Sequence, residues 1–345
     1  MFKNIFSFKI FGSNLGIDLG TTNTIIYAED EGIVLDAPSV LAISQNDGRI
    51  MGIGKEAKEM VGKTPKNILA VRPLQDGVIA DFDIAQKMVK YFISQVQPHR
   101  PLIGPQMVIG VPSQATEVER KAVVDIAAGV GARKVHLIAE SVAAVIGADL
   151  PLSEPSGNII VDIGGGSSET AVISLNGVVI SHCIRIAGDE MDRAIIQYLR
   201  EAHNLFIGEQ MAERIKITIG DLSSDKEEKM KVRGRDSATG FPHEMEVNSK
   251  EIGEVLFPPV STICDMIETT LEETPPELSG DIMQRGIYLT GGGACIKGLD
   301  AYISKRIHLL VNMVAQPLLS VALGTGKLLK DQKLLSAVEA TLPAD

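Results

Sequence analysis

Two stretches of the chain repeat one pattern, and this repeat limits the fold more than any other feature of the sequence. They are residues 18–34 and 162–179. In each, an apolar strand ends in Asp-x-Gly, a turn of Gly, Ser and Thr follows, and two more apolar strands come after it. One copy is near the start of the chain and the other near its middle, which indicates a duplicated domain.

Such turns between strands can bind phosphate, because glycine permits a tight bend and several backbone N–H groups then point at one place. For a single turn a plain hairpin is the simpler explanation. Two matching turns, at residues 20–24 and 164–168, favour phosphate binding. Asp18 and Asp162 end the strands beside them. A carboxylate there can hold a hydrated Mg²⁺, which takes few protein ligands.

The rest of the chain alternates strands with helices, so the sequence predicts an α/β fold. Apolar residues at helical spacing indicate helices at residues 116–130, 141–148 and 189–203, and one from near Ser249 to Pro275. Short strands are expected at residues 135–138 and 287–290, and an interdomain linker at residues 150–155. A length of 345 residues is more than one ordinary core needs and predicts two domains.

Composition excludes several classes of function. The formal net charge of -11 disfavours broad electrostatic binding to nucleic acid. Cys183, Cys264 and Cys295 are odd in number and form no CxxC pair, which argues against a disulfide framework or a zinc site and suits a reducing cytoplasm. No apolar run reaches transmembrane length, and the apolar residues 1–11 lack the cleavage site of a signal peptide.

Three further motifs are ambiguous when taken alone. Glu140 follows a strand and precedes a small-residue helix, so it either orients an attacking water or is a carboxylate favoured at a helix start. The glycine cluster at 291–293 either lets a flat ring lie against the backbone or begins a helix. Glu213 and Lys216 share a helix face, which spacing alone explains as a solvated surface.

The motifs together resemble a known superfamily. Residues 16–24 and 161–166 resemble the two phosphate motifs of the actin, sugar-kinase and DnaK-type chaperone ATPases, and residues 289–294 resemble their adenosine motif. Further stretches are similar to the MreB family of bacterial actin-like proteins in particular, over nearly the whole chain. These stretches are residues 32–40, 72–82, 212–216, 274–278 and 321–324.

The resemblance implies an actin-like fold of two similar domains, each a mixed sheet flanked by helices, around a nucleotide cleft. Domain I would span 1–150 with a small insertion at about 33–66, and domain II would span 151–323 with one at about 184–248. Residues 324–345 would return to domain I.

The resemblance also assigns site residues for ATP and Mg²⁺. Asp18 and Asp162 would hold the metal, and Glu140 and Ser167 would serve catalysis. The nucleotide would be held by Thr21, Thr22, Asn23, Gly164, Gly165, Gly166, Glu213, Arg214, Ile215, Lys216, Gly291, Gly292, Gly293 and Ala294. The chain departs from the family at Ser141, where a proline is usual, and at Ser167-Ser168, where Thr-Thr is usual.

The function implied is slow ATP hydrolysis by a protein that polymerises into double protofilaments, lies on the inner face of the cell membrane and organises peptidoglycan synthesis and cell shape. Membrane contact would come from the apolar N-terminal stretch, as a helix or as a strand-like extension, and from Leu102 and Ile103. The resemblance implies cell-shape membrane proteins such as MreC, MreD and RodZ as partners, and no nucleic acid.

Two other functions in the superfamily are weaker candidates. A metabolite kinase usually carries a larger inserted substrate domain than this chain offers. A chaperone ATPase needs a peptide-binding domain, and only about twenty residues follow Gly324, which is well below the usual size of a domain.

Overall fold

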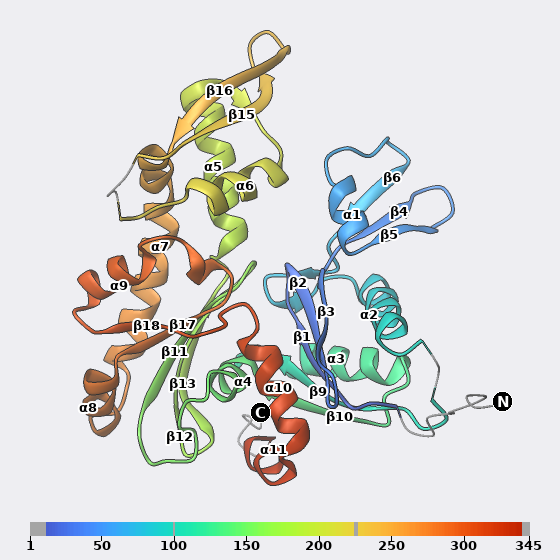
Figure 1. The fold of residues 1–345 in the computed structure, drawn as a ribbon, viewed down its shortest axis with the longest axis vertical. Coiled ribbons are helices and arrows are strands. Elements are labelled where there is room, and N and C mark those ends of the chain that lie inside the picture. The colour runs from blue at the N-terminus through green and yellow to red at the C-terminus, as the bar shows by residue number, and fades with distance from the viewer. Residues whose placement is uncertain (1–11, 99–100, 224–226, 340–345) are drawn as a thin grey trace, which may run out of the picture. The chain divides into compact units, whose positions relative to one another are not determined.

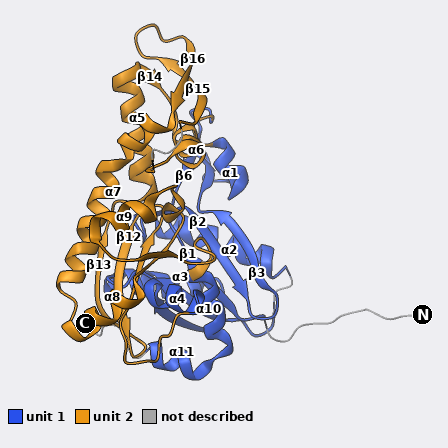
Figure 2. Cartoon of the chain, turned by 60° about the vertical axis from the view of Figure 1, so that its left-hand side comes forward, with its two compact units in different colours: residues 1–60, 64–149, 321–345 blue, residues 61–63, 150–320 orange. Residues whose placement is uncertain are grey.

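The computed structural model describes residues 12–98, 101–223 and 227–339, and these residues divide into two compact units. Of the described residues, unit 1 contains those within 12–60, 64–149 and 321–339, and unit 2 contains those within 61–63 and 150–320 (Figure 2). The chain therefore leaves unit 1 after Asp149 and returns to it at Val321.

The main sheet of unit 1 has the strand order β10-β9-β1-β2-β3 (Figure 1). Strands β1, β2 and β3 form an antiparallel meander, whereas β9 and β10 continue the sheet in parallel with β1. The bounds are β1 Leu15–Leu19, β2 Asn23–Ala28, β3 Gly32–Pro38, β9 Gln106–Val111 and β10 Lys134–Ala139.

The main sheet of unit 2 repeats this arrangement in the order β13-β12-β11-β17-β18. Its meander is β11 Asn158–Ile163, β12 Ser168–Ser174 and β13 Gly177–Ile184, and its parallel strands are β17 Ile287–Thr290 and β18 Val311–Met313. Both meanders carry a register shift within their second strand, at Ile26/Tyr27 and at Val172/Ile173. The duplication predicted from the sequence is thus present in the topology.

Helices cover these sheets and bury their apolar faces. In unit 1, α3 and α4 pack on β10, and the core includes the fully buried Leu15, Met88 and Met107. A capping box at Thr116 and Glu119 fixes the start of α3. The helices of unit 1 are α1 Lys55–Met60, α2 Phe82–Val96, α3 Glu117–Gly129, α4 Glu140–Gly147, α10 Ser320–Lys330, whose first residue belongs to unit 2, and α11 Gln332–Glu339.

In unit 2, the long helix α7 packs on β12 and β13, and α5 packs against α6 and α7. A second capping box, at Asn248 and Glu251, begins α7. The helices here are α5 Gly188–His203, α6 Glu209–Ile219, α7 Ser249–Glu272, α8 Pro276–Arg285 and α9 Leu299–Ile307, with a short 3₁₀ turn η1 at Gly293–Cys295.

Each unit also carries small sheets outside its main one. In unit 1 these are β5-β4-β6 and the pair β7-β8, and in unit 2 it is β14-β15-β16. Their bounds are β4 Leu41–Ser44, β5 Ile50–Ile53, β6 Ile68–Val71, β7 Leu74–Gln75, β8 Val78–Ile79, β14 Leu205–Phe206, β15 Lys229–Asp236 and β16 Pro242–Asn248.

The helices and strands expected from periodicity agree with α3, α4, α5, α7, β10 and β17 to within a few residues. The glycine cluster does not begin a helix directly, since η1 and a turn at Gly298 come before α9. Among the described residues, no helix is both long and apolar enough to cross a membrane. The apolar residues 1–11 lie outside the described part of the chain.

The close packing of α4 on α10 can be tested at Gly324. A Cβ atom on Gly324 would lie 1.8 Å from the carbonyl oxygen of Ala143, so Gly324→Ala forces the helices apart. We expect it to lower the free energy of unfolding by about 2 kcal/mol or more. Gly280→Ala in α8 is the control, because a Cβ there meets nothing within 4 Å. It should raise stability by about 0.5–1 kcal/mol. Denaturant titration measures both, and equal effects would contradict the packing.

Candidate functional site

In unit 1, strands β1, β9 and β10 are mutually parallel, so their carboxyl ends meet at one edge of the sheet. The first glycine turn follows β1, Pro112 follows β9, and Glu140 follows β10. Gly110 leaves room for the catalytic candidate, since a Cβ on Gly110 would lie 3.2 Å from the Glu140 Cγ atom. The sheet thus brings Glu140 and the first turn to the same edge.

Hydrogen bonds from the protein fix the backbone of the first turn. The Ser39 hydroxyl donates to the Gly20 carbonyl at 2.7 Å, and the Ser39 amide donates to the Thr22 carbonyl at 2.8 Å. The Thr21 hydroxyl accepts from the Gly77 amide at 2.9 Å. The carbonyl oxygens of Gly20 and Thr22 are therefore bonded within the protein, so they would not repel a phosphate bound at the turn.

The Thr22 hydroxyl oxygen is buried and has no hydrogen-bond partner among the described residues. An unsatisfied buried hydroxyl costs about 1–3 kcal/mol, so such a group suits a ligand that would complete it. Its place in the turn, beside Thr21 and Asn23, fits a phosphate oxygen. This is the strongest observation in unit 1 for a bound anion.

The Asp18 carboxyl lies beside the same turn in surroundings that disfavour its charge. Burial, and next the charge of Asp36, raise the pKa of Asp18 to about 7. A divalent cation would favour the charged form, so Asp18 fits a metal ligand. Within the described residues no three or more His, Cys, Asp or Glu side chains cluster as a metal cage. An ion that keeps most of its water, such as Mg²⁺, would suit this donor set.

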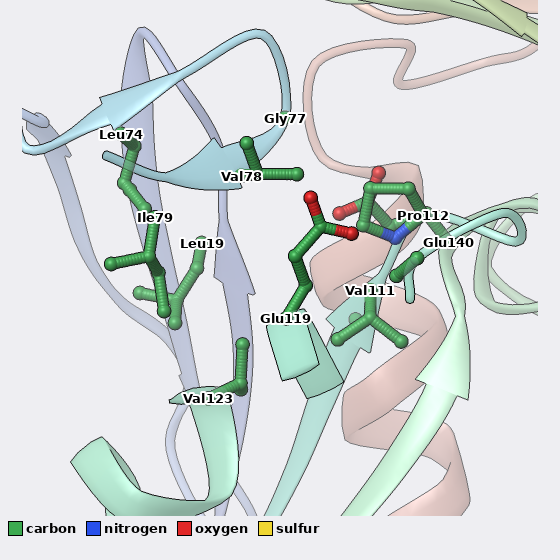
Figure 3. A pocket seen from close by; sticks show the side chains of 12 residues that line it. Leu19, Leu74, Gly77, Val78, Ile79, Val111, Pro112, Glu119, Val123 and Glu140 are labelled. Carbon is green, nitrogen blue, oxygen red and sulfur yellow. The ribbon is translucent and has the colours of Figure 1, made fainter. Parts of the chain in front are cut away.

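A small cavity lies at this edge, with a volume of about 20 Å³, enough for one water molecule (Figure 3). Apolar side chains such as Leu19, Leu74 and Val78 line it together with two carboxylates, Glu119 and Glu140. Glu119 is not among the site residues predicted from the sequence. The Thr-x-x-Glu pattern at 116–119 would have found it as a capping residue, and its carboxylate does accept from the Thr116 amide at 2.8 Å.

Ser141 stands where a proline is usual in the family that the sequence resembles, and it makes a contact that proline lacks. Its hydroxyl lies 2.8 Å from the Ser113 hydroxyl, and both side chains are buried. Ser113 belongs to the loop after β9, and Ser141 is the second residue of α4. This hydrogen bond ties the helix start that carries Glu140 to the loop beside the cavity.

In unit 2, the parallel pairing of β11 with β17 places two glycine segments side by side. Asp162 pairs with Thr290, so the turn after β11 lies next to the cluster after β17. Gly291 has a φ of 85°, and a Cβ there would lie 2.3 Å from the Asp162 Oδ1 atom. A Cβ on Gly293 would lie 2.5 Å from the Ile163 Cγ2 atom. Both glycines are therefore required for this packing.

The start of α5 holds the second turn from the other side. The Gly188 and Asp189 amides donate to the carbonyls of Gly164 and Gly165, at 3.2 and 2.7 Å. The Lys216 ammonium of α6 donates to the Gly188 carbonyl at 2.7 Å. Lys216 is thus brought to the turn, which spacing along the sequence could not show.

The remaining predicted residues differ in what their side chains can reach. Glu213 is half-buried and Arg214 is exposed, whereas Ile215 and Ala294 are fully buried in the core of unit 2. The side chains of Ile215 and Ala294 are therefore packing groups, and only their backbone atoms are left for a ligand. The Ser167 carbonyl accepts from the Gly164 amide at 3.0 Å and closes the turn, and the Ser168 hydroxyl donates to the Ile186 carbonyl at 2.7 Å.

Comparisons with known proteins agree with this architecture. The sequence pattern of the family described as MreB/Mbl protein matches residues 12–337. The cell shape-determining protein Mbl of Bacillus subtilis (strain 168) is 43% identical over 327 residues, covering 94% of this chain and 98% of that protein. The cell shape-determining protein MreB of Escherichia coli (strain K12) is 47% identical over 329 residues, covering 93% and 94%.

Solved structures give the same answer for the fold. The crystal structure of MreB5 of Spiroplasma citri bound to AMPPNP superposes with a TM-score of 0.89 at 37% identity, covering 94% of this chain and 96% of that one. The MamK double helical filament matches with a TM-score of 0.79 at 24% identity, covering 93% and 98%, which is evidence of the fold alone. The actin-like α/β fold expected from the sequence is confirmed.

The unpartnered hydroxyl of Thr22 gives a test in which stability and binding separate. Thr22→Val removes no hydrogen bond within the protein and relieves the cost of the unsatisfied hydroxyl, so we expect the free energy of unfolding to stay the same or to rise by up to about 3 kcal/mol. If the turn binds the phosphates of an adenine nucleotide, the affinity for that nucleotide should fall about 5–10-fold, which corresponds to the loss of one hydrogen bond. Thr24→Val is the control, because the buried Thr24 hydroxyl lies 2.9 Å from the Ser39 hydroxyl. It should cost about 1–2 kcal/mol of stability.

Calorimetric titration and thermal unfolding of both variants give the result. Unchanged affinity in the Thr22 variant would mean that its hydroxyl does not meet the ligand.

Proposed function

Because this chain belongs to the MreB/Mbl family, we propose that it binds and slowly hydrolyses magnesium ATP and polymerises into filaments that lie on the inner face of the cell membrane and organise cell-wall synthesis and cell shape. The observation that carries the proposal is the pair of glycine turns, each at the carboxyl ends of parallel strands and each with its carbonyls bonded within the protein. The crystal structures of MreB5 of Spiroplasma citri bound to AMPPNP and to ADP support an adenine nucleotide as the ligand.

In this proposal the phosphates are bound by backbone amides and hydroxyls of the two turns. Thr21, Thr22 and Asn23 serve from unit 1 and Gly164, Gly165 and Gly166 from unit 2. Asp18 and Asp162 take the metal, directly or through its water. Mg²⁺ supplies charge neutralisation at the phosphates when it is bound. The buried hydroxyl of Thr22 and the raised pKa of Asp18 are what favour this assignment over a plain pair of hairpins.

The nucleoside would lie against the glycine cluster after β17, with Glu213, Arg214 and Lys216 from α6 beside it. Support comes from Gly292, where a Cβ would meet nothing within 4 Å, so a ligand can approach its backbone. The Lys216 contact with Gly188 links α6 to the turn in the same unit.

Hydrolysis would depend on Glu140. Its carboxylate lines a cavity of one-water size, beside the edge that carries the first turn, and a carboxylate can orient or deprotonate an attacking water. The Ser113–Ser141 hydrogen bond would keep the start of α4 in place in the absence of the usual proline. The hydroxyl of Ser167, which lies in the second turn, would assist hydrolysis.

Polymerisation separates this function from a metabolite kinase or a chaperone ATPase. The test is to mix the purified protein with ATP and Mg²⁺ and to sediment it. We expect ATP-dependent pelleting and filaments by electron microscopy. A protein that binds ATP but stays in the supernatant at every concentration tried would overturn the filament part of the proposal.

Glu140→Gln should separate binding from chemistry. The substitution keeps the shape of the side chain and removes its charge, so we expect nucleotide affinity within about threefold of wild type and turnover reduced about 100-fold or more. Glu119→Gln is the matched control in the same cavity, because glutamine preserves the capping box. Turnover is measured by phosphate release. Normal turnover in the Glu140→Gln variant would contradict a catalytic role and leave Glu140 as a carboxylate favoured at a helix start.

The membrane surface would include the segment between Pro101 and Pro105. Leu102 is 78% exposed and Ile103 is 38% exposed, so neither folds back fully into the core of unit 1. Burying each in lipid is worth roughly 1.5–3 kcal/mol, which binds one protomer weakly and a filament of many copies firmly. The apolar N-terminal stretch would add to this contact. Membrane proteins such as MreC, MreD and RodZ are the proposed partners there.

Liposome co-sedimentation tests this surface. Leu102→Ser with Ile103→Ser should reduce lipid pelleting of assembled protein about tenfold or more, because two exposed apolar anchors are lost in every subunit. Val118→Ser with Leu69→Ser is the control, since both residues are exposed in the same unit, at 79% and 49%. Equal pelleting of the two variants would place the membrane surface elsewhere.

A further inference from the structure

An ion pair between α5 and α6 is buried beside the second glycine turn. The Lys216 Nζ atom lies 2.9 Å from the Asp192 Oδ1 atom, and each side chain is only 12% exposed. Both residues belong to unit 2, and the first amides of α5 donate to the carbonyls of the turn. Lys216 is among the site residues predicted from the sequence, whereas Asp192 is not.

Asp192 is connected to the turn through Lys216. The same ammonium donates to the Gly188 carbonyl at 2.7 Å, and the Gly188 amide donates to the Gly164 carbonyl at 3.2 Å. A Cβ on Gly188 would lie 3.2 Å from the Lys216 Nζ atom and 3.6 Å from the Gly165 Cα atom. The ammonium therefore lies next to the turn, and Asp192 is the carboxylate that holds it there.

The charge on Asp192 is costly where it lies. Burial raises the pKa of Asp192 to about 6, and the Lys216 ammonium opposes this rise. The negative charges of Glu213 on α6 and of Asp189 on α5 raise the pKa of Asp192 further. From α7, which also packs on α5, Glu251 reaches Tyr198 and His203 further along the helix.

A buried ion pair adds little net stability, because desolvation offsets the attraction between the charges. Its use here is then to fix a geometry, namely the position of the Lys216 ammonium. We propose that Asp192 is a positioning residue of the nucleotide site: it holds Lys216 against the Gly188 carbonyl, and through this contact it fixes the second glycine turn in the form that binds phosphate. The inference rests on the proposed function, since the ligand is taken to be the nucleotide.

Protonation of the Asp192 carboxylate should therefore weaken nucleotide binding. Above pH about 6 the carboxylate is charged and holds Lys216. Below that pH it becomes neutral and the ion pair is lost, so nucleotide affinity should fall as the pH drops through about 6. Asp192→Asn mimics the neutral form at every pH.

The experiment is calorimetric titration of the full chain with magnesium ADP between pH about 5 and about 8. We expect the Asp192→Asn variant to bind magnesium ADP about 10-fold more weakly than wild type at neutral pH. This difference in affinity should disappear toward the acid end of the range, where Asp192 of the wild type is also neutral. Taking the ratio of wild type to variant removes the titration of the nucleotide and of other groups. Asp192→Glu should recover part of the affinity. Glu190→Gln, which removes a charge from the exposed side of the same helix, should bind as wild type does.

Two further variants separate positioning from a merely structural role. Lys216→Met and the double variant Asp192→Asn, Lys216→Met should bind equally weakly, because Asp192 acts only through Lys216. The double variant leaves no member of the ion pair buried without its partner, so it can be compared with Lys216→Met even if the single Asp192→Asn variant does not fold. Additive losses, or a constant ratio of affinities across the pH range, would overturn the inference. Absence of nucleotide binding by wild type would instead overturn the proposed function.

Discussion

Parallel pairing of strands is the constraint on which the candidate site depends. In unit 1 the strands β1, β9 and β10 run the same way, and in unit 2 so do β11, β17 and β18. Segments far apart in the sequence therefore end at one edge of each sheet. The pairing of Asp162 with Thr290 is the clearest case, because it sets a glycine turn against a glycine cluster more than a hundred residues away.

The two turns satisfy their backbone carbonyls by different means. In unit 1 the side chain and amide of a single residue, Ser39, bind the carbonyls of Gly20 and Thr22. In unit 2 the first amides of α5 bind those of Gly164 and Gly165. Either solution removes acceptor oxygens that would repel a phosphate. A helix start would otherwise be the natural place for an anion, and here its amides are used to shape the turn.

The serines that depart from the family pattern have structural partners. Ser141 shares a hydrogen bond with Ser113, so the start of α4 is held by a side-chain contact where a proline would restrict the backbone directly. The Ser168 hydroxyl bonds to the Ile186 carbonyl ahead of α5, and the Ser167 carbonyl closes the second turn. The hydroxyl groups of Ser141 and Ser168 thus each have a structural role in this chain, independent of the rate of hydrolysis.

The sequence by itself determined the α/β class, the duplicated meanders and the helices α3, α4, α5 and α7, because hydrophobic spacing and turn residues act over a few positions of the chain. It also picked out Asp18, Asp162, Glu140 and the glycine segments as candidates. Only the tertiary structure decided which of these meet. That Ile215 points into the core, that Glu119 shares a cavity with Glu140, and that Asp192 holds Lys216 all depend on contacts between separate elements. Local sequence patterns cannot predict such contacts, because a charged helix face has the same residue spacing whether it faces solvent or packs against another helix.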